Sequence, residues 1–298
     1  MADSFSLKTT SEPLVLVRKF VFTLAIATFF LMALGSATRV MNAGLSCPDW
    51  PLCYGEIVPA NQMNLQVFLE WFHRVVASTV GLLTAAFVGM TWWYRSLLPK
   101  WLPWAAVGSF CLVLFQGILG GLTVTELLRF DIVTAHLGTG LLFFCTLLGI
   151  TINLLPYQAY NTVGRLPWFG SAAVVFVYLQ SILGALVASR WAVHQCLAGS
   201  ELCVVVNTHI AGVVPASLSI LAIIFLTWRT AALQPLLRSL AYTAGMLLAM
   251  QVAIGVATYS LHLQIEPLTV LHQAVGAALL GTLVAFTGLA WRDRLESI

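Results

Sequence analysis

Apolar segments of about 20 residues recur along the whole chain, and each is long enough to span a bilayer as an α-helix. Hydrophobic residues make up 60% of the 298 residues and charged residues only 8%, which excludes an ordinary soluble domain. The net charge of +3 comes without a basic stripe or a nucleic-acid-binding motif, so we expect no nucleic-acid partner. The sequence therefore predicts an all-α integral membrane protein.

The hydropathy pattern predicts eight transmembrane helices. Their expected ranges are 20–40, 70–94, 101–124, 131–155, 167–189, 204–228, 238–260 and 267–291. Lys and Arg indicate the orientation, because short cytoplasmic loops are enriched in them. Ten of the 14 lie on one side of the membrane: Lys8, Arg18, Lys19, Arg95, Lys100, Arg165, Arg229, Arg238, Arg292 and Arg294. We expect a multi-pass protein of the plasma (cell) membrane with both termini in the cytoplasm.

The two halves of the chain repeat. His73 and His136 are 63 residues apart, as are His209 and His272. The odd-numbered spans also share related segments, which read FQGILG at 115–120, LQSILG at 179–184 and MQVAIG at 250–255. Four spans per half keep the same orientation, so the repeat predicts two pseudo-symmetric four-helix bundles.

This repeat divides the chain into five expected segments. They are a cytoplasmic N-terminal segment at 1–19, an N-terminal bundle at 20–155, a cytoplasmic linker at 156–166, a C-terminal bundle at 167–291 and a cytoplasmic tail at 292–298.

The four repeated histidines lie near the outer ends of even-numbered spans, at similar depth. Histidines from two helices can meet across the core of a four-helix bundle, and two facing neutral imidazoles suit axial ligation of a haem iron. Glycines such as Gly138 and Gly276 follow the histidines and are expected to let a flat macrocycle approach the backbone. The alternative is a histidine that only hydrogen-bonds helices together. Zinc is disfavoured, because no span has an HxxxH or mixed His/Cys spacing.

Glu70 breaks the repeat. It lies three residues before His73, on the same helix face, whereas the position 136 residues later is Val206. This asymmetry predicts a permanently held haem in the second half and a reactive centre in the first. The alternative for Glu70 is an acidic residue in a first helical turn, favoured by the helix dipole.

Three arginines at the outer ends of spans are candidate contacts of haem propionates. Arg74 directly follows a repeated histidine, and Arg39 and Arg190 each close a span shortly before a cysteine-containing loop. For Arg74, snorkelling to the membrane surface is the alternative. His194 and His262 have no partner at the repeat spacing, and we expect them to be outer-loop residues.

Two outer loops each carry a pair of cysteines. Cys47 and Cys53 flank a segment with two prolines, and Cys196 and Cys203 close a similar loop. Disulfides form and persist outside a bacterial plasma membrane, so we expect the bonds Cys47–Cys53 and Cys196–Cys203. Loop stapling and a redox-active pair both remain open. A structural metal site is disfavoured, because thiols of separate loops would have to converge.

With these residues the chain resembles haem A synthase. The resemblance is carried by GLSCPDWPLC at 44–53, EWFHR at 70–74, TAHLG at 134–138, NTH at 207–209 and LHQ at 271–273, and it covers nearly the whole chain. It implies an eight-span oxidoreductase that acts on a CH3 group. The reaction it implies is oxidation of the C8 methyl group of haem O to the formyl group of haem A, which serves terminal oxidases.

The resemblance also implies roles for the site residues. His209 and His272 would hold haem b as a cofactor. His73 and His136 would bind the substrate haem O, with Glu70 as the catalytic residue. These implied roles agree with the asymmetry between the halves.

The resemblance further implies a first-loop disulfide, Cys47–Cys53, linked to activity. A haem O synthase and an electron-transfer partner are the candidate protein partners. The main alternative function is a di-haem b-type membrane electron-transfer protein without substrate chemistry. A haem carrier is disfavoured, because almost no ionisable groups reach the cytoplasmic half of the spans.

Overall fold

The computed structural model describes residues 12–189, 201–262 and 264–296, and the regular structure in these ranges is helical. Eight helices are long and apolar enough to cross a membrane, which confirms the expected all-α membrane fold. Their bounds are α2 (Glu12–Val40), α3 (Leu65–Trp93), α4 (Leu102–Thr125), α5 (Phe130–Asn153), α6 (Leu166–Ser189), α7 (Glu201–Arg229), α8 (Pro235–Ser260) and α9 (Glu266–Leu295), and a short 3-10 turn, η1 (Ala60–Gln62), lies between α2 and α3.

The helices follow the predicted spans but extend further at several ends. The first helix begins at Glu12 rather than at residue 20, because Leu14 and Val17 continue its apolar face and are buried. The last helix continues past residue 291 to Leu295, and Asp293 in its final turns is buried. Parts of the expected N-terminal segment and tail are therefore helical.

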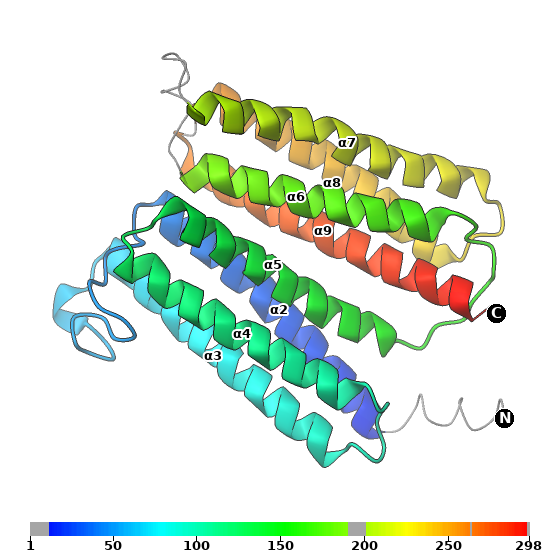
Figure 1. Cartoon of the computed structure of the whole chain (residues 1–298), viewed down its shortest axis with the longest axis horizontal. Helices are drawn as coiled ribbons and strands as arrows, with labels where there is room; N and C mark the ends of the chain where they lie inside the picture. The colour runs from blue at the N-terminus through cyan, green and yellow to red at the C-terminus, as the bar shows by residue number, and fades with distance from the viewer. Residues whose placement is uncertain (1–11, 190–200, 263, 297–298) are drawn as a thin grey trace.

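The helices form two four-helix bundles that lie side by side (Figure 1). In the first bundle, α2–α5, helices α2 and α4 each pack on both α3 and α5. In the second bundle, α6–α9, helices α6 and α8 pack in the same way on α7 and α9. The pairing of helices is thus the same in both halves, as the sequence repeat predicts.

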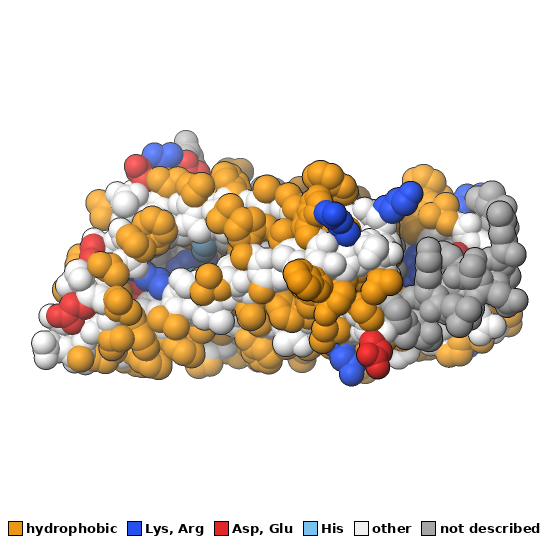
Figure 2. All heavy atoms as spheres, turned by 90° about the horizontal axis from the view of Figure 1, so that it is seen from below, with side chains coloured by type: hydrophobic (Ala, Val, Ile, Leu, Met, Phe, Trp, Pro, Cys, Tyr) orange, Lys and Arg blue, Asp and Glu red, His pale blue; other side chains and the backbone are white. Residues whose placement is uncertain are grey.

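Helices α2, α5, α6 and α9 form the interface between the bundles. In the most apolar segment of α5 and of α9, half of the residues are buried, whereas in that of α8 only 11% are buried. Helices α5 and α9 therefore lie at the centre of the molecule. Glycines allow these two helices to approach, since a Cβ on Gly281 would lie 3.0 Å from Leu148 and one on Gly288 would lie 3.1 Å from Ile152. Apolar side chains cover much of the outer face in Figure 2, as expected for a surface in contact with lipid.

The connection between the bundles is held on the end of α9. Asp293 accepts hydrogen bonds from the Tyr157 hydroxyl at 3.0 Å and from the Tyr160 backbone N–H at 2.9 Å. Arg292 donates to the carbonyls of Ile152 and Leu155, at 2.7 and 2.9 Å. These bonds fix the linker at the end of the molecule opposite the α2–α3 loop (Figure 1).

Candidate functional site

Residues 41–64, the cysteine loop, connect α2 to α3 and project from one end of the first bundle (Figure 1). Asn64 ends the loop as the N-cap of α3, because its side-chain oxygen accepts a hydrogen bond from the backbone N–H of Val67 at 2.9 Å. The cap sets where α3 begins. It thereby places Glu70 in the second turn of the helix and His73 one turn further, on the same side.

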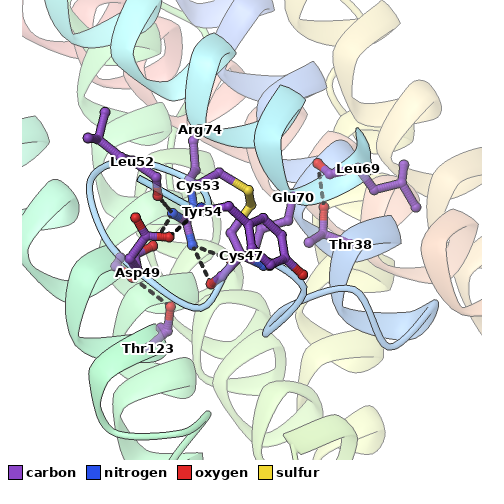
Figure 3. A network of polar contacts seen from close by, with 11 residues as sticks. Thr38, Cys47, Asp49, Leu52, Cys53, Tyr54, Leu69, Glu70, Arg74 and Thr123 are labelled. Carbon is purple, nitrogen blue, oxygen red and sulfur yellow. Dashed lines mark hydrogen bonds and ion pairs between the residues drawn. A yellow bond between two sulfur atoms is a disulfide. The ribbon is translucent and has the colours of Figure 1, made fainter. Parts of the chain in front are cut away.

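Glu70 is only 4% exposed, and its carboxylate joins α3 to the cysteine loop (Figure 3). Oε2 accepts a hydrogen bond from the backbone N–H of Cys47 at 2.8 Å, and Oε1 forms an ion pair with Arg74. Arg74 also donates to the loop carbonyls of Asp49 and Leu52, each at 2.5 Å. Glu70 is therefore held by specific partners in addition to any effect of the helix dipole.

The cysteine loop folds back on itself around a disulfide. Cys47 and Cys53 are bonded, with their Cα atoms 4.7 Å apart, and both side chains are buried. Asp49 closes the turn between them by accepting hydrogen bonds from the backbone N–H groups of Tyr54 at 2.6 Å and Gly55 at 2.7 Å. The bond from Gly55, followed by that from Tyr54, holds the pKa of Asp49 below its ordinary value.

Sequence reasoning missed the part that Asp49 plays. The available signal was an aspartate between two prolines inside a cysteine pair, followed by Gly55. Gly55 has a φ of +71°, which glycine adopts without steric cost. Aspartate commonly accepts hydrogen bonds from backbone N–H groups in such turns.

Each of the four repeated histidines contacts a glycine on the preceding helix. The glycine–histidine contacts, given as the distance from a Cβ on the glycine to the imidazole Cε1, are Gly35–His73 (2.8 Å), Gly120–His136 (3.3 Å), Gly184–His209 (3.0 Å) and Gly255–His272 (2.9 Å). A larger side chain at these positions would displace the ring, because protein interiors are close-packed. The repeated segments that end in glycine thus help to set the position of the imidazoles.

The two histidines of each bundle come from its two even-numbered spans. In the second bundle the ring centroids of His209 and His272 are 6.5 Å apart. In the first bundle His73 comes from α3 and His136 from α5. Within the described ranges, the Nδ1 atoms of His73 and His136 are buried without a hydrogen-bond partner. Such nitrogens are available to bind a ligand.

The second-bundle pair has the spacing that one shared metal ion needs. A metal–imidazole bond of about 2.0–2.1 Å sets two ligating nitrogens about 4 Å apart and the ring centres roughly 6 Å apart. The centroids of His209 and His272 are 6.5 Å apart. Two protein ligands would suit a haem, because the macrocycle itself supplies the other ligands of its iron. These residues therefore fit a haem.

A hollow opens on the first-bundle side of the molecule. Figure 2 shows a histidine side chain at depth in this hollow, with basic side chains beside it, at the end that carries the cysteine loop. Arg39, in the last turn of α2, is half-buried. Its guanidinium makes no hydrogen bond or ion pair to any other residue that the structure describes. Arg74, in contrast, is bonded to the cysteine loop, and a propionate contact for either arginine stays a prediction.

The glycines that follow the histidines do not lie open. A Cβ on Gly138 would lie 2.6 Å from Ile182, and one on Gly276 would lie 3.1 Å from Gln251. These glycines make room for side chains of neighbouring helices. Side chains of neighbouring helices lie beside them, and the expectation that they let a macrocycle approach stays a prediction.

Some predicted residues lie outside the described side chains. These are Arg190, His194 and the Cys196–Cys203 pair, and their roles stay predictions. His262 is described and lies exposed in the α8–α9 connection with a φ of +52°, which agrees with the expected loop position.

Comparison with known proteins identifies the family. Residues 18–284 match the COX15-CtaA family, described as cytochrome oxidase assembly protein. The chain belongs to this family. The matched range includes all or part of each of the eight helices, the cysteine loop and all four repeated histidines.

The curated relatives extend this match across most of the chain. Proteins named heme A synthase from Shewanella oneidensis, Rhizorhabdus wittichii and Caulobacter vibrioides are each 27% identical to it. The alignments cover 89% of this chain and 93% of the Shewanella protein, 87% and 90% for the Rhizorhabdus protein, and 98% and 99% for the Caulobacter protein. The resemblance seen in the motifs is therefore confirmed over the whole architecture.

Proposed function

We propose that the protein is a haem A synthase, which oxidises the C8 methyl group of haem O to a formyl group by successive hydroxylations. One structural observation carries the proposal. Both bundles hold a pair of histidines against glycines, but among the described side chains the first bundle alone has a buried carboxylate, Glu70, one turn from its histidine. The names of the curated relatives support the same activity.

The second bundle holds haem b in this proposal. His209 and His272 would hold its iron, and the 6.5 Å between their ring centroids supports the assignment. When bound, haem b supplies electron-transfer chemistry. The chain's own contribution is to fix the imidazoles, which Gly184 and Gly255 do by packing against the rings.

The first bundle binds the substrate, haem O. His73 and His136 are the proposed ligands of its iron, and the hollow in Figure 2 supports access from this side. Arg39 is the better placed of the two described arginines for a propionate, because its side chain has no other partner among the described residues. Arg74 instead positions the cysteine loop beside the site.

Glu70 is the proposed catalytic residue. It takes up a proton as the methyl carbon is oxidised, or it orients a water molecule that attacks this carbon. An ionised carboxylate has about four acceptor positions. The bonds from Cys47 and Arg74 use two of them, so Glu70 can accept a further proton or water without releasing the loop.

The proposed location is the plasma membrane, with both termini in the cytoplasm and the cysteine loop outside. The charge distribution of the sequence supports this orientation. A haem O synthase that supplies the substrate and an electron-transfer partner are the proposed protein partners.

The test is extraction and chromatography of the haems from protein purified after co-expression with a haem O synthase. The variant is Glu70→Gln, which keeps the size and an acceptor oxygen for Cys47 but removes the charge. Glu126→Gln is the matched control, because Glu126 is an exposed carboxylate at the same end of the first bundle. Mass spectrometry of the Cys47–Cys53 bond reports whether the loop is intact.

We expect haems b and A from the native protein and the control. Glu70→Gln should accumulate haem O, with haem b and the disulfide unchanged. Native protein that carries only haem b, at two per chain, would contradict the proposal. That result would instead support a di-haem electron-transfer protein, the function that the similar glycine–histidine contacts in both bundles also permit.

A further inference from the structure

A glutamine precedes three of the four contacting glycines by one helical turn. Gln116 precedes Gly120, and the same spacing occurs in the second bundle with Gln180 and Gln251. The equivalent residue before Gly35 is Leu31. Three of the four histidines therefore have a glutamine nearby, and His73 does not.

Each of these glutamines reaches the histidine that contacts its glycine. The Gln180 amide nitrogen lies 2.6 Å from the backbone oxygen of His209 and 3.1 Å from its Nδ1 atom. The Gln251 amide nitrogen lies 3.4 Å from Nε2 of His272. These contacts cross from one helix to the next, so they restrain the ring and its helix together.

Gln116 also contacts its histidine, His136, but through the histidine backbone and not through the imidazole ring. Its amide nitrogen donates to the carbonyl of His136 at 2.7 Å. Leu31 has no polar atom to offer His73, whose Nδ1 atom, like those of His136 and His272, is buried without a hydrogen-bond partner in the described part of the chain. The number of polar restraints therefore falls from the second bundle to the first.

The glutamine amides also have an unused acceptor. The Oε1 atoms of Gln116, Gln180 and Gln251 are buried, and none has a hydrogen-bond partner among the described residues. A histidine that binds metal through one ring nitrogen carries a proton on the other and usually donates it to a nearby acceptor. For Gln251, whose amide nitrogen lies 3.4 Å from Nε2 of His272, rotation of the terminal amide would present Oε1 to a proton on that nitrogen.

We propose that Gln180 and Gln251 are positioning residues that orient His209 and His272 for a tightly held haem, and that Leu31 leaves His73 as the weakly restrained ligand of an exchangeable one. The inference rests on the proposed function and deepens it, because it identifies His73 as the ligand that releases the haem iron when substrate enters and product leaves. A ring without a second partner loses its orientation more readily once its metal bond breaks.

The geometry around His73 matches that around His209 in the second bundle, so the role of Leu31 can be tested by replacing it with glutamine. A Cβ on Gly35 would lie 2.8, 3.4 and 3.5 Å from Cε1, Nδ1 and Nε2 of His73. The corresponding distances from Gly184 to His209 are 3.0, 3.6 and 3.7 Å. A glutamine at position 31 would therefore start from the same place relative to its histidine as Gln180 does.

The experiment measures transfer of haem b from the purified full-length protein to excess apomyoglobin. The protein is first loaded with haem b alone at both sites, and loss is followed by absorbance. We expect a fast phase from the first bundle and a slow phase from the second. His73→Ala and His209→Ala, each of which removes one site, assign the two phases.

Leu31→Gln should slow the fast phase alone, by about 10-fold or more, the usual effect of a partner outside the ligand set. Gln180→Leu and Gln251→Leu should accelerate the slow phase alone by a similar factor. Gln158→Leu is the control, because Gln158 is exposed in the linker at the other end of the molecule. Unchanged phases in Leu31→Gln and in both second-bundle variants would overturn the proposal.

A second readout separates positioning from general destabilisation. A partner that accepts the ring N–H makes the imidazole a stronger donor to the metal. Gln251→Glu should therefore lower the reduction potential of the slow-phase haem, and Gln251→Leu should raise it. Shifts in the same direction, or none, would contradict a positioning role.

The outcomes also distinguish this inference from the proposed function. Protein that shows the expected phases but yields no haem A on co-expression with a haem O synthase would overturn the proposed function and leave the positioning roles intact. If the protein makes haem A but substitutions at positions 31, 180 and 251 leave the rates of both haem-transfer phases unchanged, the positioning roles alone would be overturned.

Discussion

The carboxylate of Glu70 accepts a hydrogen bond from the backbone N–H of Cys47 at 2.8 Å, which joins helix α3 to the disulfide of the cysteine loop. His73 lies one turn further along the same helix. The loop, the carboxylate and a proposed haem ligand are therefore connected through one hydrogen bond and one turn of α3.

Removing the carboxylate should destabilise the loop as well as stop the reaction. Glu70→Ala leaves Arg74, whose side chain is 14% exposed, without its only carboxylate among the described residues. Breaking a buried pair on one side costs about 3–5 kcal/mol, and the remaining carbonyl contacts of Arg74 favour the lower end. A thermal unfolding series with Glu70→Ala, Arg74→Ala and the double variant measures the coupling. Additive effects would show that the two side chains do not interact.

Gly184→Ala should expel haem from the second bundle. An added Cβ would lie 3.0 Å from Cε1 of His209, so the ring must move away from its position opposite His272. Gly89→Ala is the control, because nothing lies within 4 Å of a Cβ there. Alanine is a better helix former than glycine by roughly 1 kcal/mol, so the control should be neutral or stabilising. Haem content per chain is the measurement, and an unchanged value in Gly184→Ala would refute the prediction.

Asp49 should make the cysteine loop sensitive to acid. Its pKa in the folded loop lies below the ordinary value because the N–H groups of Gly55 and Tyr54 bond to the ionised form. The stabilisation is therefore complete above the ordinary carboxyl pKa of about 3.9 and is lost as the pH falls through the lower folded value.

Reduction of the Cys47–Cys53 bond by a phosphine reductant, which works in acid, measures this effect. The rate should rise as the pH falls below about 4, and Asp49→Asn should be faster than native protein at neutral pH. Equal rates at pH 7 for native protein and Asp49→Asn would show that Asp49 does not restrain the loop.

The linker should weaken in alkaline solution through Tyr157. Burial, followed by the nearby charge of Asp293, raises the pKa of its hydroxyl. Above the ordinary tyrosine pKa of about 10 the unfolded chain loses this proton while the folded chain keeps it, so stability should fall as the pH rises.

Tyr157→Phe removes both the hydrogen bond to Asp293 and this pH dependence. The variant should lose about 1 kcal/mol at neutral pH, and its thermal stability should fall less steeply than that of native protein above pH 10. Parallel stability curves for the two proteins would place the alkaline sensitivity elsewhere.

The spans and their pairing were predictable from sequence because bilayer thickness and the repeat leave few alternatives. The histidines could be predicted as ligand candidates for the same reason, since four at equal depth in a duplicated pattern are rare. The contact between each histidine and a glycine could not, because it depends on the register between two helices. The register between α2 and α3 is set across a loop of more than twenty residues, which leaves no signal of fixed spacing.

The partners of Arg74 show a second limit. A basic residue beside a proposed haem ligand predicts a propionate contact as readily as a structural one. Which contact Arg74 makes depends on the path of the cysteine loop. The Asp49 side chain accepts a hydrogen bond within this loop, and the Asp49 carbonyl accepts one from Arg74. Every residue has a backbone carbonyl, so the sequence does not show which carbonyls an arginine will bind.

The four glycine–histidine contacts make a two-helix hairpin the smallest complete unit of this architecture. One helix of each hairpin supplies the glycine and the next supplies the histidine. Two such hairpins together supply the pair of histidines of one bundle. Each bundle thus combines two such hairpins, and the same small helical unit is used four times along the chain, with the cysteine loop and the buried Glu70 found in its first copy.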